Sequence, residues 1–163
     1  MKMFTIGYEG ADIGDFLETL DILGVDRVVD IRDLPASRRR DFSKNILSAH
    51  LSDSGITYSH FKALGDPKEG REAMRSGDRQ KFLEVFNARM VTEAAQNALE
   101  EVKDIALSET IVLLCYERDH KDCHRSIVAD EIRRLTNIEV KHAGVRKDAR
   151  KFRASMSHGV AAV

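Results

Sequence analysis

A strand–helix–strand pattern at the start of the chain restricts the fold more than any other feature of the sequence. Met3–Tyr8 is a short apolar run, and the apolar side chains between residues 13 and 23 recur with the helical period of about 3.6. Asp12 precedes this helical stretch as a capping residue, and Gly24 ends it before a β-branched run at Arg27–Ile31. This order predicts a βαβ unit, in which the two strands are parallel.

The same alternation continues along the rest of the chain. Three more runs are typical of short strands, namely Ile56–Phe61, Ile111–Cys115 and Ile138–His142. Helical periodicity occupies residues 43–54, two stretches between residues 78 and 106 that join near Thr92, and a segment from about Cys123 to Leu135. We therefore expect an α/β, single-domain, three-layer fold with a mainly parallel sheet of about five strands.

Length and composition are those of one globular domain. A chain of 163 residues can bury roughly two-thirds of the surface that its unfolded form exposes. With 42% hydrophobic and 33% charged residues, it does not resemble a disordered or disulfide-built protein. We expect the α/β domain to span residues 1–153 and the last segment, residues 154–163 (ASMSHGVAAV), to form a flexible tail.

The sequence shows no export signal and no apolar stretch of roughly 18 residues, so we expect a cytoplasmic protein with no membrane partner. A formal net charge of −1 provides no overall attraction to nucleic acid, so anion binding would have to come from local basic clusters. In a cytoplasmic chain, two cysteines are more typical of thiols, metal ligands or redox-active groups than of a structural disulfide.

Polar side chains follow each of the first four predicted strands. The segments that leave these strands read GYEG, DIRDLPASRRR, FKALG and CYERDHKDCHR. Because ligands of open parallel sheets bind beyond the carboxyl ends of the strands, these segments should meet at one edge. The candidate site residues that they carry are Tyr8, Glu9, Asp30, Arg32, Arg38, Cys115, Cys123, His124 and Arg125.

Both cysteines lie in one stretch, Ile111–Arg125. At a helix start, the thiol of Cys123 would experience the positive end of the helix dipole and the charge of Arg125, which lower a thiol pKa and favour a nucleophilic thiolate. The same helix end could hold a phosphate through free backbone N–H groups. A structural interpretation is equally open, in which Cys123 is a small, partly buried residue and Cys115 belongs to the core.

The two sulfur atoms should be neighbours, because a strand end usually lies close to the start of the following helix. They could form a reversible disulfide or share a metal. Four side chains of this stretch are of types suited to zinc, although their spacing matches no common zinc motif: Cys115, His120, Cys123 and His124. No arginine stands five or six positions after either cysteine, as in Cys-phosphatase and sulfurtransferase loops, and the GxGxxG, GxxxxGK[ST] and GxSxG motifs are absent.

Four motifs together resemble the domain-of-unknown-function 488 family of prokaryotic proteins. They are TIGYEG, VVDIRDLPASRRRDFSK, YSHFKALG and LLCYERDHKDCHRSIVADEI, in the family's order between Thr5 and Ile132. The family typically has a glycine doublet where this chain has Leu64, Gly65 and Asp66. The resemblance implies a compact α/β domain with its shared polar residues near the Cys-His-Arg segment, and it implies no particular reaction.

From these observations we expect an anion- or phosphate-binding site at the carboxyl ends of the strands, which could belong to a Cys-dependent enzyme acting on a nucleotide or nucleic acid. Cys123 or Cys115 would be the nucleophile or redox group, with Glu9 or Asp30 as the acid or base. The anion would be held by a set of polar side chains, which are Arg32, Arg38, Arg125, His124 and Tyr8.

Two other functions fit the same sequence. A non-catalytic module could bind nucleic acid or protein through the Arg38–Arg40 loop and the basic segment Lys141–Arg153. The cysteines and histidines could instead form a zinc-stabilised structural site. The sequence identifies no cofactor and leaves the oligomeric state open.

Overall fold

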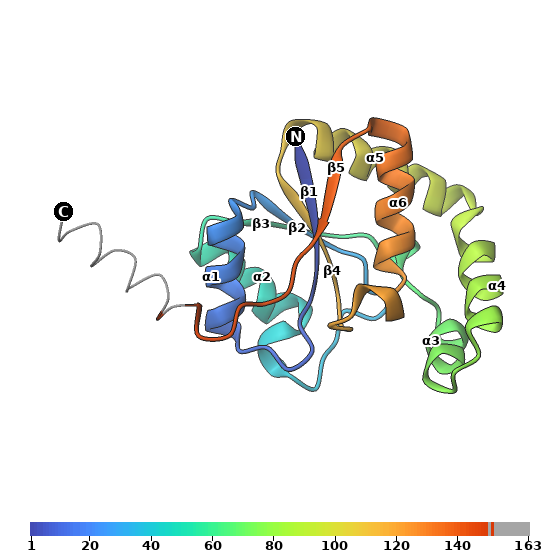
Figure 1. Ribbon diagram of the computed structural model, residues 1–163, viewed down its shortest axis with the longest axis horizontal. Helices are drawn as coiled ribbons and strands as arrows, with labels where there is room; N and C mark the ends of the chain where they lie inside the picture. Colours follow the sequence, from blue (N-terminus) through green and yellow to red (C-terminus); the bar gives the residue numbers. More distant parts are fainter. Residues whose placement is uncertain (150, 152–163) are drawn as a thin grey trace.

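A parallel β-sheet forms the centre of the molecule (Figure 1). The computed structural model describes residues 1–149 and 151, and within them the sheet has five strands in the order β3-β2-β4-β1-β5. The strands are β1 (Lys2–Gly7), β2 (Arg27–Asp30), β3 (Thr57–His60), β4 (Ile111–Cys115) and β5 (Glu139–His142). Every neighbouring pair is parallel, which confirms the α/β fold predicted from the sequence.

Six α-helices surround the sheet in the described part of the chain. They are α1 (Ile13–Leu23), α2 (Lys44–Asp53), α3 (Lys68–Arg75), α4 (Arg79–Met90), α5 (Glu93–Ser108) and α6 (Arg125–Thr136). The residues predicted to end the first helix lie at the two ends of α1. The Asp12 carboxylate accepts a hydrogen bond from the Asp15 N–H at 3.0 Å, and Gly24 ends the helix with a φ of 70°. These local contacts explain why its ends follow directly from the sequence.

The helix α3 differs from the sequence analysis, which predicts no helix between the third strand and residue 78. Its buried positions are Gly70 and Ala73, so it lacks the apolar period that predicts a helix. Packing against α4 supports it instead. At the other end of the chain, α6 begins at Arg125, so Cys123 lies immediately before the N-cap residue His124.

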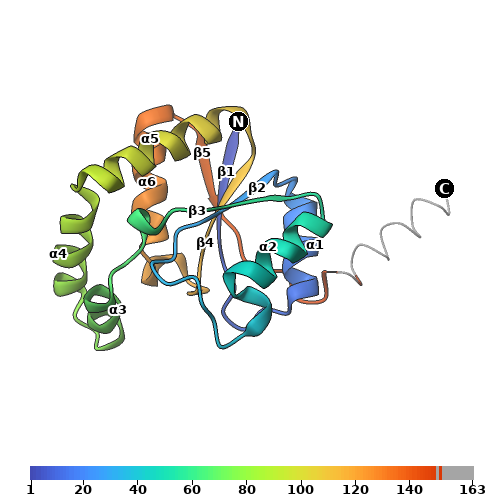
Figure 2. The same ribbon diagram turned by 180° about the vertical axis from the view of Figure 1, so that it is seen from behind.

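Helices cover both faces of the sheet. In Figures 1 and 2, α1 and α2 lie on one side of the strands, α5 and α6 lie on the other, and α3 and α4 continue outward from the α5–α6 side. The core divides accordingly. Phe16 of α1 and Leu47 of α2 share a cluster with Val112 of β4, whereas Phe86 of α4 shares a second cluster with the next residue, Leu113. Successive residues of β4 thus serve opposite faces, as expected for a central strand.

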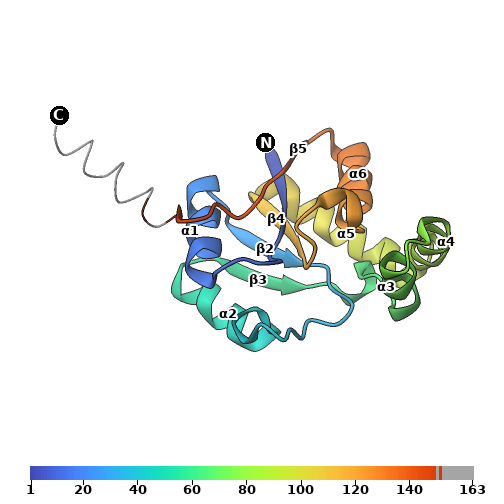
Figure 3. The same cartoon turned by 60° about the horizontal axis from the view of Figure 1, so that its bottom comes forward.

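At the carboxyl edge of the sheet, the connections from neighbouring strands lead to opposite faces. The chain passes from β1 to α1 and from β2 to α2 on one face, whereas it passes from β4 to α6 on the other. Because β4 lies between β2 and β1, a crevice opens where these strands end, which is where ligands of open α/β sheets bind. Figure 3 shows the segment after β2 running between α2 and the α3–α4 pair at this edge.

The predicted flexible tail, residues 154–163, lies outside the described residues. The basic segment that begins at Lys141 is described as far as Ala149 and at Lys151. Across the residues that the structure describes, the helices are too short or too polar for any of them to cross a membrane.

Candidate functional site

A cleft of about 940 Å³ lies at the carboxyl edge of the sheet. Its walls come from the segments that follow β1, β2 and β4 and from α3 with the residues just before it. The structure therefore brings several strand ends together at one cavity. Of the candidate site residues, those that line the cleft are Tyr8, Arg32, Arg38, Cys115 and His124.

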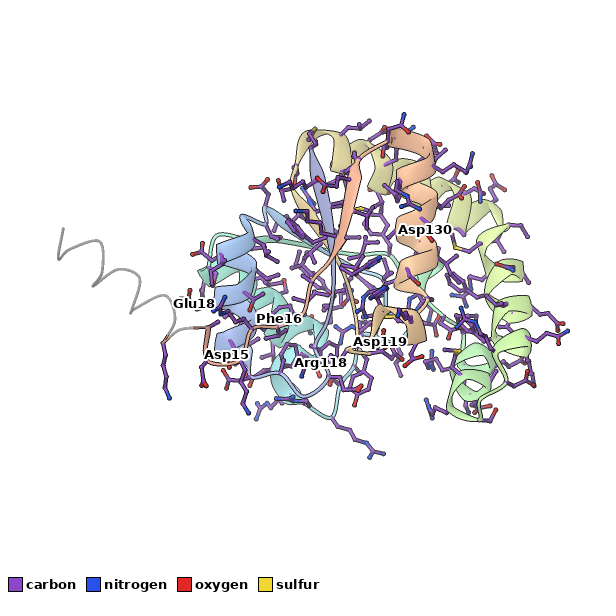
Figure 4. The ribbon with its side chains drawn as sticks, viewed as in Figure 1. Asp15, Phe16, Glu18, Arg118, Asp119 and Asp130 are labelled. Atoms are coloured by element: carbon purple, nitrogen blue, oxygen red, sulfur yellow. A yellow bond between two sulfur atoms is a disulfide. The ribbon has the colours of Figure 1, made fainter. Side chains whose placement is uncertain are left out.

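A smaller pocket of about 550 Å³ contains two other candidates, Glu9 and Arg125. One wall of this pocket is the loop after β4, where Arg118 and Asp119 are labelled in the lower middle of Figure 4. Glu117 of the same loop lines both cavities, so the loop separates them. The structure thus divides the predicted site between two adjacent cavities.

Asp30 lies below the cleft surface, where it forms a buried ion pair with Arg32. Arg32 Nη2 lies 2.7 Å from Asp30 Oδ2, and Arg32 Nε donates to Oδ1 at 2.9 Å. The Tyr58 hydroxyl donates to Oδ2 at 2.5 Å. The remaining guanidinium nitrogen, Nη1, donates to the Tyr8 hydroxyl at 3.1 Å and to the Phe42 carbonyl at 2.8 Å. Both charged groups are therefore occupied within the protein, and they organise one wall of the cleft.

The protonation states of this network are fixed by its contacts. Burial alone would lower the pKa of Arg32, but the hydrogen bonds and charge of Asp30 raise it above its usual range. Burial and the Asp30 carboxylate raise the pKa of Tyr58, so its hydroxyl remains a donor. The ring of Tyr8 stacks on Phe42 with 4.5 Å between centroids, which fixes its orientation at the cleft.

The structure joins Cys115, at the end of β4, to Cys123 by a disulfide, and both residues are buried. Arg125 donates to both sulfur atoms, from Nη1 to Cys115 Sγ at 3.0 Å and from its backbone N–H to Cys123 Sγ at 3.4 Å. A guanidinium group and the N–H groups of a helix start both stabilise a thiolate. These contacts favour anionic sulfur when the bond is reduced. Cys115 is one of the residues that line the cleft, whereas Cys123 is not.

His124 is the buried N-cap residue of α6. Its Nε2 lies 2.7 Å from the Ile31 carbonyl oxygen, so Nε2 carries the hydrogen and Nδ1 is left as an acceptor. Nδ1 lies 3.7 Å from Cys123 Sγ, and the ring meets Phe86 edge-on. Burial lowers the pKa of His124 to about 4. The imidazole is therefore neutral near pH 7, and its Nδ1 can accept a hydrogen bond from the Cys123 thiol when the disulfide is reduced.

The depressed pKa of His124 predicts how stability depends on pH. The unfolded chain protonates this histidine near pH 6.5, whereas the folded chain does so only near pH 4. Its contribution to stability is complete above about pH 6.5, and it should fall by roughly 1.4 kcal/mol per pH unit on acidification towards pH 4. Urea unfolding across this range should show that loss in the wild type relative to His124→Gln, which keeps a donor for Ile31.

The matched control is His50→Gln, which replaces a partly exposed histidine of α2 that contacts Asp41. The free energy of unfolding of His50→Gln should depend on pH as that of the wild type does. It should therefore differ from that of His124→Gln by the same pH-dependent amount. If the free energies of unfolding of the wild type and His124→Gln changed equally between about pH 6.5 and pH 4, the result would contradict a buried neutral imidazole.

Arg125 is also buried, although it is the first residue of α6. Besides Cys115 Sγ, its guanidinium donates to Thr5 Oγ1 at 3.2 Å, to the Arg118 carbonyl at 3.0 Å and to the Glu117 carbonyl. Burial lowers its pKa to about 10, so it remains charged near pH 7. Arg125 thus connects the loop after β4 to β1 and to the disulfide.

Three potential metal ligands meet near the disulfide. Among the described residues, the ligand atoms of Cys115, Glu117 and Cys123 lie within 4.8 Å of one another. The histidines of the predicted zinc set are not in this group, and the ring of His120 stacks on another histidine instead. The Arg125 guanidinium, 3.0 Å from Cys115 Sγ, places positive charge where a divalent cation would bind. The geometry therefore favours thiol chemistry over metal binding.

Sequence reasoning missed three charged side chains near α3 that line the cleft, namely Asp66, Arg71 and Arg75. Burial raises the pKa of Asp66 to about 7 and also raises the pKa of Glu117. Asp33, from the segment after β2, pairs with Arg71 at 3.2 Å and with Arg89 at 2.9 Å. Asp66 lies just before α3, and Arg71 and Arg75 lie within this helix; the density of charged residues between residues 66 and 75 is the sequence signal that could have indicated them.

The comparisons with known proteins identify one related family. The model of the family described as domain of unknown function DUF488 matches residues 12–132, which include the segments after β2 and β4 that line the cleft. Neither a curated protein nor a solved structure matches the chain.

Proposed function

The chain belongs to the DUF488 family, a domain of unknown function, and from its cleft we propose that it is a cysteine-dependent enzyme that binds a phosphate-bearing ligand. The ligand class is a nucleotide or the end of a nucleic acid. A cytoplasmic location is part of the proposal, because a disulfide in a reducing compartment is more typically catalytic than structural.

One observation supports this proposal above the others: available arginines and a cysteine line the same cleft. Arg38 and Arg75 are exposed, and neither has an acidic partner within ion-pair distance in the described part of the chain. They come from different elements, the segment after β2 and α3. Guanidinium groups bind phosphate oxygens through paired hydrogen bonds, so an anion held by them would lie in the cavity that Cys115 lines.

Apolar side chains at the same cleft support a ligand with a planar or apolar part. Tyr116 is 48% exposed and Leu34 is 61% exposed, and both line the cleft. Large apolar side chains that remain exposed at a cavity commonly contact a ligand, and aromatic rings stack on nucleic-acid bases. Phosphate-binding arginines next to such side chains suit a nucleotide better than a small inorganic anion.

The proposed roles follow from the contacts of the two sulfur atoms. Cys115 is the nucleophile, and the Arg125 guanidinium stabilises its thiolate. Cys123 is the second thiol, and His124 Nδ1 accepts a hydrogen bond from it in the reduced protein. Oxidation of the two thiols to the disulfide removes two electrons and two protons, so Cys115 is reactive only in the reduced protein.

Protection from alkylation tests both parts of the proposal in reduced protein that carries Cys123→Ser. Iodoacetamide should modify Cys115 with a half-maximal rate below about pH 8.5, the value of an ordinary thiol. Because pyrophosphate held by the arginines would cover the sulfur, it should slow this modification by about fivefold or more. Mass spectrometry of the modified peptide measures both rates.

The arginines are tested by the double variant Arg38→Glu/Arg75→Glu, which should abolish protection by pyrophosphate without changing the pH profile of alkylation. Arg133→Glu, at an exposed arginine of α6, is the matched control and should retain protection. The proposal would be refuted if pyrophosphate left the alkylation rate of Cys115 unchanged and if this rate depended on pH as it does for an ordinary thiol. Binding of nucleic acid without any thiol reactivity would favour the non-catalytic module instead.

A further inference from the structure

Asp66 lies on the cleft between β3 and α3, in a backbone segment held from two sides. Gly65 packs so closely on the Asp33 backbone that a Cβ at Gly65 would overlap it. Arg71 Nη1 donates to the Asp66 carbonyl oxygen at 2.8 Å. The position of Asp66 is therefore set by main-chain contacts, and its carboxyl group takes no part in them.

The carboxyl group of Asp66 has no hydrogen-bond partner among the described residues, although the residue is only 6% exposed. Oδ1 is sealed from solvent and packs against Gly70, where an added Cβ would overlap it. Oδ2 is the oxygen left to reach the cleft. Burying a polar atom without a partner is costly, and glycine inside a helix is also unfavourable. The fold nevertheless keeps both features at the wall of one cavity.

The charged groups that face Asp66 come from each neighbouring element. Arg71 of α3 and Arg89 of α4 are positive, but both are engaged by Asp33. Glu117, from the loop after β4, adds negative charge. Burial, together with Glu117 and Asp33, raises the pKa of Asp66 to about 7 against the opposing effect of the two arginines. The carboxyl group therefore changes charge in the neutral pH range.

We propose that Asp66 makes the cleft a proton-coupled oxyanion site, in which its protonated carboxyl donates a hydrogen bond from Oδ2 to one oxygen of a bound dianion. The proton comes from solvent when the dianion enters and returns to solvent when it leaves. An ionised carboxylate at this position would repel the same ligand. This inference rests on the anion binding of the proposed function, and it specifies dianionic oxyanions such as a terminal phosphate monoester.

Inorganic sulfate is a suitable probe, because it stays a dianion between pH 6 and pH 8 and any pH dependence must come from the protein. NMR titrations with sodium sulfate, at an ionic strength held constant with chloride, give the dissociation constant at each pH. If only the protonated carboxyl binds, the dissociation constant of the wild type should rise about tenfold from pH 6 to pH 8. In Asp66→Asn, which cannot ionise, it should change by less than about twofold over this range.

Asp122→Asn is the matched control, because it removes an exposed carboxylate from the same cleft. It should keep the tenfold dependence of the wild type. A sulfate affinity of the wild type that is constant from pH 6 to pH 8 would overturn the inference, and this measurement does not depend on the folding of any variant. A dependence that persists in folded Asp66→Asn would also overturn it and would leave the proposed function intact. Absence of saturable sulfate shifts at every pH would refute the anion site itself.

Discussion

Replacing Arg125 by leucine is expected to lower the free energy of unfolding by about 3–5 kcal/mol. Arg125 is 1% exposed, and its guanidinium donates to Thr5 Oγ1, Cys115 Sγ and two carbonyl oxygens of the loop after β4. Leucine would leave these buried acceptors without donors, at a cost of about 1–3 kcal/mol for each one that cannot reach water. Urea unfolding at pH 7, with the disulfide kept oxidised, measures the change.

Two further variants show whether the geometry of the guanidinium or its charge is responsible. Arg125→Lys keeps the charge, but its single nitrogen cannot satisfy acceptors on β1, on β4 and in the loop together, so it should recover only part of the loss. Arg133→Leu, at an exposed arginine of the same helix, should change the free energy of unfolding by no more than about 0.5 kcal/mol. A loss below about 1 kcal/mol for Arg125→Leu would show that water replaces the missing donors.

The second large effect is expected at the ion pair below the cleft. Asp30→Ala should destabilise the protein by about 3–5 kcal/mol, because it leaves the buried guanidinium of Arg32 without its carboxylate. The Asp30 side chain is fully buried, and it accepts from Arg32 at 2.7 and 2.9 Å and from Tyr58 at 2.5 Å. Denaturant unfolding at pH 7 provides the comparison with the wild type.

Removing both charges together separates the cost of an unpaired charge from the value of the pair. Asp30→Leu/Arg32→Met replaces both charges by apolar side chains and should be more stable than Asp30→Leu alone by about 1–3 kcal/mol. If the double variant were as unstable as or less stable than this single variant, the buried charge of Arg32 would not be the cause of the loss.

Much of the fold follows from local patterns. Apolar runs with β-branched residues mark the strands, and caps such as Asp12 and Gly24 mark the ends of α1 where the structure has them. The parallel order places the carboxyl ends at one edge, so the meeting of Tyr8, Arg32 and Cys115 at one cleft could also be predicted. The helix α3 could not, because its buried residues are small and packing against α4 supports it.

The sequence does not distinguish among the arginines of the candidate site. Arg32, Arg38 and Arg125 all follow strand ends, and all three suit an anion when only the sequence is considered. The structure separates them: Arg32 and Arg125 are buried with their guanidinium groups engaged, whereas Arg38 is exposed at the cleft. Arg75, which carries the same proposed role as Arg38, becomes visible only through the position of α3.

The sequence alone determined the parallel α/β sheet and the segments that form its carboxyl edge, because strand periodicity, helix caps and turn residues act within a few positions. Only the tertiary structure decided which polar groups are satisfied within the protein and which remain for a ligand. His124 Nε2 is held by the Ile31 carbonyl, 93 residues away along the chain, whereas the carboxyl of Asp66 is buried without a partner among the described residues. Such differences depend on contacts between distant segments, which no local pattern records.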